Sequence, residues 1–180
     1  MTAVRRLASD ELSKEEVAAL RELFGAAWGG NSDEFTDEDW DHALGGLHFI
    51  LEEGGALVAH ASVVERELHT SGHILATGYV EAVATWPIHQ RRGHGSALMR
   101  DVDEHIDETF QLGALDTGSS AFYERLGWVV WNGPTFVRTN SGLIRTPQED
   151  GNVLVRLTPT SPELDLWAPI SCDWRPGDVW

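Results

Sequence analysis

The feature that most constrains the fold is a glycine-containing loop at residues 90–95, which reads Gln-Arg-Arg-Gly-His-Gly. The segment before it, residues 74–85, combines apolar and small residues and predicts a central strand. That strand should end before Pro87, because proline cannot donate a hydrogen bond to a neighbouring strand. The segment after the loop predicts an amphipathic helix over residues 96–108, with an apolar stripe at Leu98, Val102 and Ile106.

A strand–loop–helix unit of this kind can bind an anion at the start of its helix. The first amides of a helix have no partner within it, and the helix dipole places partial positive charge there. Gly93 and Gly95 let the backbone approach a ligand closely, and Arg91 and Arg92 add countercharge. The loop lacks Gly-Lys-Ser/Thr and a third glycine, which argues against a nucleotide P-loop and a dinucleotide fingerprint. We therefore interpret it as a pyrophosphate-binding loop.

The remaining pattern predicts an α/β or α+β fold, with a mixed central β-sheet flanked by helices. Ser13 followed by Glu16 is a capping-box signature, so a helix should begin there and end near Gly25. A second helix should run from Thr36 to about Leu44. A short helix is expected over 119–126, and further strands over 2–7, 47–51, 56–68, 111–115, 128–131, 136–139 and 153–157.

The whole chain, residues 1–180, is expected to form a single domain, because its length suits one core and no linker or repeat divides it. Residues 158–180 are rich in Pro and Trp and show little periodicity, so we expect an irregular tail there. No apolar run approaches the ~18 residues of a membrane span, and no signal-peptide pattern is present. With Cys172 as the only cysteine, these features favour a cytoplasmic protein.

The charge balance is strongly acidic, with 13 Lys and Arg against 29 Asp and Glu and a formal net charge of −16. A surface of this sign repels nucleic-acid phosphates and anionic lipid, so we expect neither as a partner. It attracts cationic ligands and can raise the rate at which they encounter the protein. The alternative is that the acidity serves solubility alone.

Isolated reactive residues give weaker signals. The eight histidines show no paired helical spacing of the kind that zinc sites use, so we expect no metal. Cys172 is interpreted as a buried small hydrophobe. The run Glu65-Arg66-Glu67 is interpreted as the solvent-facing side of a strand.

Residues 90–95, the strand before them and the segment Ala121–Trp128, which reads Ala-Phe-Tyr-Glu-Arg-Leu-Gly-Trp, resemble the GNAT superfamily of N-acetyltransferases. In that superfamily the strand binds the pantetheine arm of acetyl-CoA, and the loop amides bind its pyrophosphate. The resemblance implies that Tyr123 protonates the departing thiolate. It also implies a set of acetyl-CoA-binding residues, namely Val83, Ala84, Thr85, Arg91, Arg92, Gly93, His94, Gly95 and Ser96.

A narrower resemblance, from about residue 20 to the end, is to aminoglycoside 2'-N-acetyltransferases. It rests on Asp39-Trp40, on Gly78–Glu81, on Arg145–Pro147 and above all on residues 172–180, which read Cys-Asp-Trp-Arg-Pro-Gly-Asp-Val-Trp. It implies transfer of an acetyl group from acetyl-CoA to the 2'-amino group of aminoglycoside antibiotics, which confers antibiotic resistance. It also implies a homodimer.

That resemblance assigns roles to individual residues. Glu81 is the general base, acting through a water, and Tyr123 is the general acid. The carboxylate of Trp180 is a further catalytic group that reaches into the site, so that the tail completes the substrate cleft. Acidic residues and this carboxylate hold the aminoglycoside, and they are Glu34, Asp39, Glu81, Asp116, Glu149, Asp178 and Trp180. The sequence departs from the family pattern at Glu34, where Asp is frequent, and at Asp116, where Ser is usual.

The chemistry of amine acetylation supports these roles independently. An ammonium group is not a nucleophile, so a carboxylate such as Glu81 must accept a proton, and a strand N–H near Val83 can stabilise the developing oxyanion. Each role has a structural alternative: Glu81 as a strand-end acid, Tyr123 as a core residue, and Asp39 as a charge at a helix start. Two functional alternatives also stay open, a different polyamine or amino-sugar acceptor and a cation-binding module without turnover.

Overall fold

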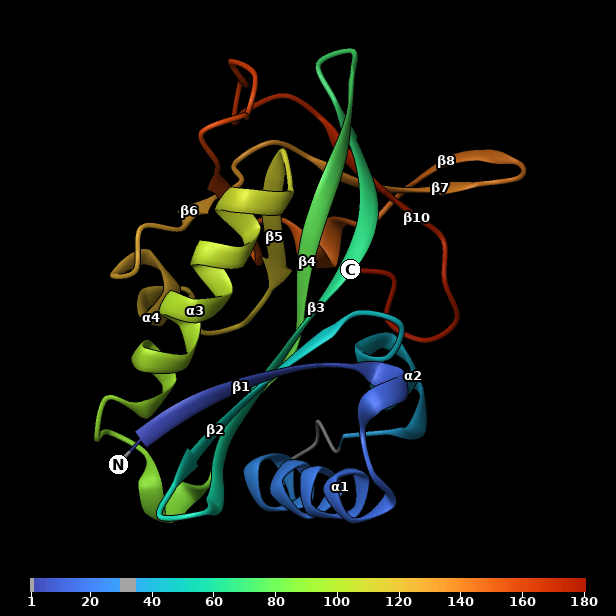
Figure 1. The fold of residues 1–180 in the computed structure, drawn as a ribbon. Coiled ribbons are helices and arrows are strands. Elements are labelled where there is room, and N and C mark those ends of the chain that lie inside the picture. The colour runs from blue at the N-terminus through green and yellow to red at the C-terminus, as the bar shows by residue number, and fades with distance from the viewer. Residues whose placement is uncertain (1, 30–34) are drawn as a thin grey trace. The chain divides into compact units, whose positions relative to one another are not determined.

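The computed structural model describes residues 2–29 and 35–180, and these form two compact units. The first unit comprises Met1–Val64 and Val80–Asp103, and the second comprises Glu65–Tyr79 and Glu104–Trp180. Three elements contribute residues to both units: strand β3 (Ala56–Thr70), strand β4 (His73–Thr85) and helix α3 (His94–Thr109) (Figure 1).

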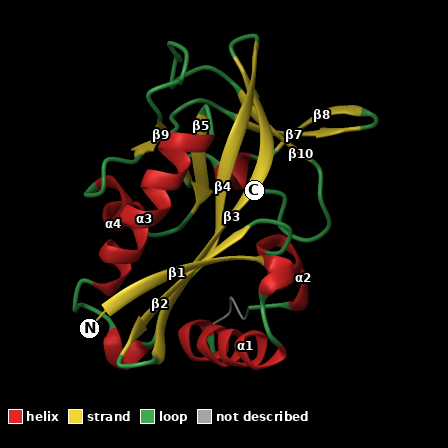
Figure 2. Cartoon of the chain, viewed as in Figure 1, coloured by secondary structure: helices red, strands yellow, loops and turns green. Residues whose placement is uncertain are grey.

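An antiparallel arrangement of three strands organises the first unit. Strand β1 (Thr2–Ala8) pairs with β2 (Leu47–Glu53), and β2 pairs with the first part of β3. Helices α1 (Lys14–Trp28) and α2 (Asp37–Ala43) lie beside these strands (Figure 2). Two short 3₁₀ helices complete the unit, η1 (Ser9–Glu11) and η2 (Pro87–His89).

The predicted helix starts at Ser13 and Thr36 are confirmed. The Ser13 hydroxyl accepts the Glu16 N–H at 3.2 Å, and the Glu16 carboxylate accepts the Ser13 N–H at 2.9 Å. Thr36 and Asp39 form the same reciprocal pair at the start of α2. Such capping boxes satisfy amides that the helix itself leaves without partners.

The predicted end of α1 near Gly25 is wrong, because the helix continues to Trp28. Its last turn is stabilised by aromatic packing, since the Trp28 ring lies 5.8 Å from the Phe24 ring and 5.2 Å from the Phe35 ring. Gly29 then caps the helix by donating its N–H to the Gly25 carbonyl at 2.7 Å. Contacts across the unit's core therefore override the weak helix propensity of glycine. That core is formed by Leu20, Leu23, Phe24, Trp40, Ile50 and Ala84.

A mixed sheet organises the second unit, in the strand order β6–β9–β5–β4–β3–β10–β7–β8. The pairs β4–β5 and β10–β7 are parallel, whereas β5–β9, β6–β9, β3–β10 and β7–β8 are antiparallel. The predicted mixed β-sheet with helices is thus confirmed. The elements are β5 (Leu112–Asp116), α4 (Ser120–Glu124), β6 (Val129–Val130), β7 (Thr135–Thr139), β8 (Gly142–Arg145), η3 (Pro147–Glu149), β9 (Val153–Leu157) and β10 (Ile170–Asp173).

The prediction that residues 158–180 form an irregular tail is corrected by strand β10. Ile170 and Ser171 pair antiparallel with the end of β3, and the whole strand runs parallel to β7. Ile170 and Cys172 are fully buried there. A four-residue strand is too short to show a period of two, which is why the sequence pattern did not reveal it.

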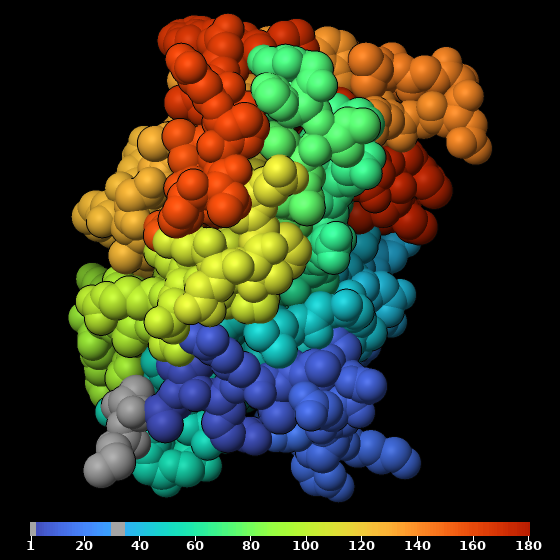
Figure 3. Space-filling view, turned by 45° about the horizontal axis from the view of Figure 1, so that its top comes forward, coloured from blue at the N-terminus to red at the C-terminus, as the bar shows by residue number. Residues whose placement is uncertain are grey.

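The hairpin of β7 and β8 projects from the second unit (Figure 3). All four residues of β8 are exposed, including Leu143 and Ile144. No helix among the described residues has the length and apolar character that a membrane span requires.

Candidate active site

The predicted pyrophosphate-binding loop, residues 90–95, lies in the first unit, after η2 and at the start of α3. Helix α3 begins at His94 rather than at the predicted Ser96, so His94, Gly95 and Ser96 form its first turn. The first bond within the helix is Ala97 N–H to the Gly93 carbonyl, at 2.9 Å. The amides of the first turn therefore have no carbonyl partner from the helix and are available for an anion.

The backbone of this loop is held in a curved shape. Gly93 has a φ of 84°, and Arg91, which has a Cβ atom, has a φ of 58° in the left-handed region. A non-glycine residue in that region carries strain, which concentrates at functional sites. The Gln90 side chain fixes the loop by donating to the Thr85 carbonyl at 3.3 Å. Arg91 and Arg92 are exposed, where they can add countercharge to a bound anion.

The side chain of His94 is directed differently from the rest of this loop. It is only 9% exposed, and its ring packs edge-on against His89, with the centroids 5.9 Å apart. The backbone N–H of His94 is therefore the group that it offers to a ligand of the loop. Its imidazole belongs to a separate cluster with His89 and Glu53, described below.

Strand β4 contains a distortion at Ala82, whose φ of 50° lies in the left-handed region. Beyond it, Trp86 donates its N–H to the Val58 carbonyl of β3 at 3.0 Å. Because backbone groups alternate in direction along a strand, Thr85 and Val83 point their own N–H and C=O groups toward the opposite edge. That orientation suits the predicted backbone contacts with a pantetheine arm. Ala84 is buried in the core of the unit instead.

Two buried histidines support the distortion at Ala82. His60 Nδ1 lies 2.9 Å from the Ala82 carbonyl, His48 Nδ1 lies 2.9 Å from His60 Nε2, and Ser9 Oγ lies 2.8 Å from His48 Nε2. Burial lowers the pKa of His48 to about 4 and, together with the charge of His48, that of His60 to about 3. Both rings are therefore neutral at pH 7.

The direction of these hydrogen bonds follows from the carbonyl at one end. The Ala82 oxygen can only accept, so His60 Nδ1 donates and its Nε2 accepts from His48 Nδ1. His48 Nε2 must then accept the Ser9 hydroxyl proton. A continuous series of hydrogen bonds thus runs from Ser9 through His48 and His60 to the carbonyl of Ala82, the distorted residue of β4. No local sequence pattern indicates this hydrogen-bonded series, because Ser9, His48 and His60 lie on three separate segments.

Glu81, the predicted general base, directly precedes the distortion and is half-buried. Its backbone carbonyl lies 3.4 Å from the Ser62 hydroxyl. The predicted acid Asp39 lies in the same unit, where its carboxylate accepts both the N–H and the hydroxyl of Thr36 at 2.7 and 2.9 Å. Asp39 therefore takes part in the capping box at the start of α2. The predicted residue Glu34 lies outside the described residues.

Tyr123, the predicted general acid, lies on α4 in the second unit. It is 8% exposed and packs edge-on against Phe122 and Trp128, with ring centroids 4.9 and 6.2 Å away. Burial raises its pKa to about 12, so the phenol is protonated at neutral pH. A general acid requires that protonation state.

Three of the predicted acids come together in the second unit. The Glu149 side chain interacts with Asp116, at the end of β5, and with the charge of Asp178. Burial is the first cause that raises the pKa of Glu149, and Asp178 is the second. Carboxylates held close together repel one another, so a cation placed between them lowers their electrostatic energy.

Trp180, the other predicted site residue of this unit, is fixed by both its side chain and its backbone. Its indole N–H donates to the Thr146 hydroxyl at 3.0 Å, and the ring is 3% exposed. Arg175 donates to the Trp180 main-chain oxygen at 2.9 Å and to the Asp178 carbonyl at 2.7 Å. The segment that ends the chain is therefore ordered by specific contacts.

The interpretation of Glu65-Arg66-Glu67 as a solvent-facing run is wrong for its middle residue. Arg66 is 7% exposed and donates to the Asp173 carbonyl at 2.8 Å and to the Val179 carbonyl at 2.9 Å. Its guanidinium also lies over the Tyr79 ring, 4.7 Å from the centroid. Cys172, by contrast, is buried as predicted, and burial raises its pKa to about 11.

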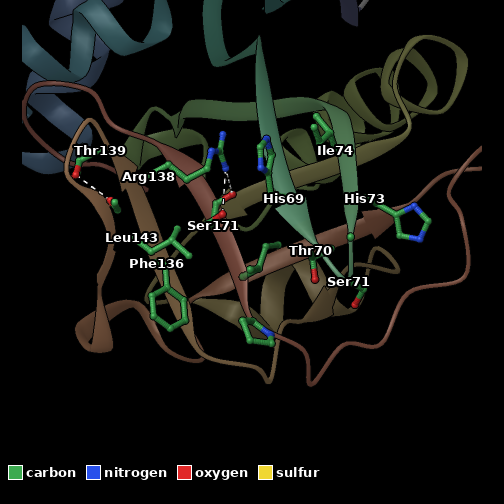
Figure 4. A pocket seen from close by; sticks show the side chains of 14 residues that line it. His69, Thr70, Ser71, His73, Ile74, Phe136, Arg138, Thr139, Leu143 and Ser171 are labelled. Carbon is green, nitrogen blue, oxygen red and sulfur yellow. Dashed lines mark hydrogen bonds between the residues drawn. The ribbon is translucent and has the colours of Figure 1, made fainter.

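A hollow of about 520 Å³ lies elsewhere in the second unit, between the tip of the β3–β4 hairpin and strands β7, β8 and β10 (Figure 4). Its walls include Thr70, Ile74, Phe136 and Leu143, and the Arg138 side chain bonds to Ser171 beside it. None of the predicted site residues lines this hollow. It is therefore distinct from the acidic cluster.

Comparisons with known proteins find similarity along the chain. A sequence model described as an acetyltransferase (GNAT) domain matches residues 9–131. The chain is also 40% identical to the aminoglycoside 2'-N-acetyltransferase of Mycolicibacterium fortuitum, an alignment that covers 98% of this chain and 91% of the relative.

Solved structures share the fold. The ribosomal-protein-S18-alanine N-acetyltransferase from Escherichia coli matches with a TM-score of 0.59 and 18% identity, over 91% of this chain and 96% of that one. A GNAT family acetyltransferase from Brucella melitensis, solved in complex with acetyl-CoA, matches with a TM-score of 0.54 and 19% identity, over 85% and 94% of the two chains. At these identities the likeness concerns the fold alone.

Proposed function

This chain belongs to the GNAT family of acetyltransferases, and from that premise we propose that it acetylates the 2'-amino group of aminoglycosides. It is an N-acetyltransferase whose acetyl donor is acetyl-CoA. The observation that carries the choice of acceptor is the 40% identity to an aminoglycoside 2'-N-acetyltransferase along 98% of this chain. The cluster of Asp116, Glu149 and Asp178 supports a polycationic acceptor.

In this proposal the loop and the strand before it bind the donor. The amides of His94, Gly95 and Ser96 bind the pyrophosphate, with Gly93 allowing close approach and Arg91 and Arg92 adding countercharge. Val83 and Thr85 bind the pantetheine arm through backbone groups. The Val83 N–H stabilises negative charge on the thioester oxygen as the amine attacks.

The chemical step is a direct transfer. The neutral 2'-amine attacks the acetyl carbonyl, a C–N bond forms, and the C–S bond to CoA breaks. The proton leaves the amine through a water to Glu81, and the CoA thiolate takes the phenolic proton of Tyr123. The Tyr123 phenol is protonated at neutral pH, as a proton donor must be.

The acidic residues hold the other ammonium groups of the acceptor. We assign this role to Asp39, Asp116, Glu149, Asp178 and the Trp180 carboxylate, and to Glu34 by resemblance alone. The whole chain then acts as one catalytic domain, with residues 158–180 completing the cleft. The hydrogen bonds of Arg175 to Asp178 and Trp180 support that role for the tail.

A thiol-release assay tests the acceptor and the position acetylated. Turnover is expected with tobramycin or gentamicin, which carry a 2'-amine, and not with kanamycin A, which carries a 2'-hydroxyl. Equal turnover of kanamycin A would refute the assignment to the 2' position. If kcat/KM is higher for a simple polyamine or an amino-sugar metabolite than for any aminoglycoside, the natural acceptor belongs to that class instead.

The resemblance also suggests a cytoplasmic homodimer that confers aminoglycoside resistance. The acidic charge supports the absence of nucleic-acid and anionic-membrane partners. Light scattering of the purified protein measures the oligomeric state, and growth of expressing cells in tobramycin measures resistance. A monomer, or cells as sensitive as the empty-vector control, would count against these two points respectively.

A further inference from the structure

Three potential metal ligands from separate segments meet in the first unit. Glu53 is the last residue of β2, His89 the last of η2, and His94 the first of α3. One ligand atom from each lies within 4.8 Å of the other two. Glu53 Oε2 is 4.0 Å from His89 Nδ1 and 3.9 Å from His94 Nε2.

The imidazole of His89 contains an unsatisfied atom. Its Nδ1 is buried and has no hydrogen-bond partner among residues 2–29 and 35–180. A buried polar atom of this kind costs free energy unless a water or an ion binds it. The atom lies on the side of the ring that faces Glu53.

Ion pairing within the cluster does not account for the geometry. At 3.9 and 4.0 Å, the Glu53 oxygen is too far from either ring nitrogen for a hydrogen bond. Elsewhere in the chain, Glu67 and His69 form such a pair at 2.6 Å. Glu53 Oε2 instead lies at nearly equal distances from His89 Nδ1 and His94 Nε2. These separations leave space for an ion between the three ligand atoms.

We propose that Glu53, His89 and His94 bind a divalent transition-metal ion, with zinc as the best match. Two imidazole nitrogens and one carboxylate oxygen form a donor set that suits zinc, whereas magnesium and calcium prefer oxygen ligands throughout. Each ligand would have to move by only a few tenths of an ångström to about one ångström to reach zinc bond lengths near 2.0–2.2 Å. A fourth position would be left for water.

The site connects the β2–β3 turn to the loop that binds the pyrophosphate. His89 and His94 flank Gln90–Gly93, so a bound ion would fix both ends of that loop. The expectation from sequence that no metal site exists rested on the spacing of histidines along helices. The third ligand, Glu53, is 36 residues before His89 and therefore lies outside any such spacing. The inference stands on these three side chains and does not depend on the acetyl acceptor.

Calorimetric titration of the chelator-treated, full-length protein with zinc tests the site. We expect one zinc ion per chain, with affinity reduced roughly tenfold or more in His89→Gln and in Glu53→Gln. Cobalt should give the visible absorption bands of a tetrahedral complex in the wild type and lose them in His89→Gln. The matched control His69→Gln removes a histidine that pairs with a glutamate but has no third ligand among the described residues, and it should bind zinc like the wild type.

Circular dichroism of each metal-free variant shows whether it is folded. Glu53 is exposed, so Glu53→Gln is expected to fold even if His89→Gln does not. Absence of stoichiometric zinc binding to the wild type would overturn the proposal. Equal zinc affinity in the wild type and in folded Glu53→Gln would overturn it as well.

Discussion

Glu81 owes its position to the neighbouring residue in β4. Ala82 has a φ of 50°, a conformation that costs about 1–2 kcal/mol for a residue with a Cβ atom. The hydrogen bond from His60 to its carbonyl, with His48 and Ser9 behind, offsets that strain. The chain of histidines therefore helps to set the direction of the strand on both sides of the distortion, at Glu81 and at Val83.

Replacing Glu81 by Gln tests its role as base. We expect kcat to fall about 10²–10⁴-fold, because the amide cannot accept the proton of the attacking amine. The dissociation constant of the aminoglycoside, measured by calorimetry, should change much less. Glu65→Gln removes the same charge from an exposed position on β3 and should leave kcat unchanged. Wild-type turnover by Glu81→Gln would exclude the role.

Residue types along the sequence identified the loop and its glycines, but they could not identify contacts between distant segments. Arg66 stands between two glutamates, a pattern that predicts an exposed side chain. Its guanidinium nevertheless donates a hydrogen bond to Asp173, which is 107 residues further along the chain. His94 was expected in the loop, but it is the first residue of α3, and its ring lies against His89. In both cases the direction of the side chain is decided by a partner that lies outside the local pattern.

Among the helices and strands, those marked by strong local sequence signals were predicted correctly. The capping boxes at Ser13 and Thr36 predicted two helix starts, because both bonds of a capping box lie within four residues. Strands β8 and β10 were missed or read as irregular, since four residues are too few to establish a period. The end of α1 depended on the aromatic contacts of Trp28, including one with Phe35.

The final segment offers a test at this scale. Arg175 holds the backbone of Asp178 and Trp180, so Arg175→Gln should loosen the end of the tail. If the tail completes the acceptor cleft, KM for tobramycin should rise several-fold, while KM for acetyl-CoA stays unchanged. Arg125→Gln removes an exposed arginine from another part of the second unit and is the matched control. Equal KM values for tobramycin in both variants and the wild type would show that the tail does not contribute to acceptor binding.

For the molecule as a whole, the net charge of −16 affects the encounter with its substrates. A polycation is steered toward an acidic protein, and salt screens this attraction over a Debye length of about 10 Å at 0.1 M. We expect kcat/KM for tobramycin to fall steeply between low and physiological ionic strength. Acetyl-CoA is an anion, so its kcat/KM should not fall in the same way. A similar decline for both substrates would indicate a general effect of salt instead.

Global stability should depend on pH through the buried pair of His48 and His60. Unfolded histidines take up protons below about pH 6.5, whereas the folded pKa values are about 4 and about 3. The unfolded state thus binds more protons in this range, so stability present above pH 6.5 is lost as the pH falls toward 4. At pH 4.5 the loss amounts to about 2 kcal/mol or more per histidine, given about 1.4 kcal/mol per pKa unit.

Urea unfolding of the wild type and of His60→Asn at pH 7 and pH 4.5 isolates this contribution. Protonation of the many carboxylates lowers the repulsion caused by the charge of −16 and favours folding at acid pH, but it does so equally in both proteins. The asparagine does not titrate, so the variant should start less stable at pH 7 and lose less on acidification. An equal loss of free energy in the two proteins would show that the buried pair does not determine the pH dependence.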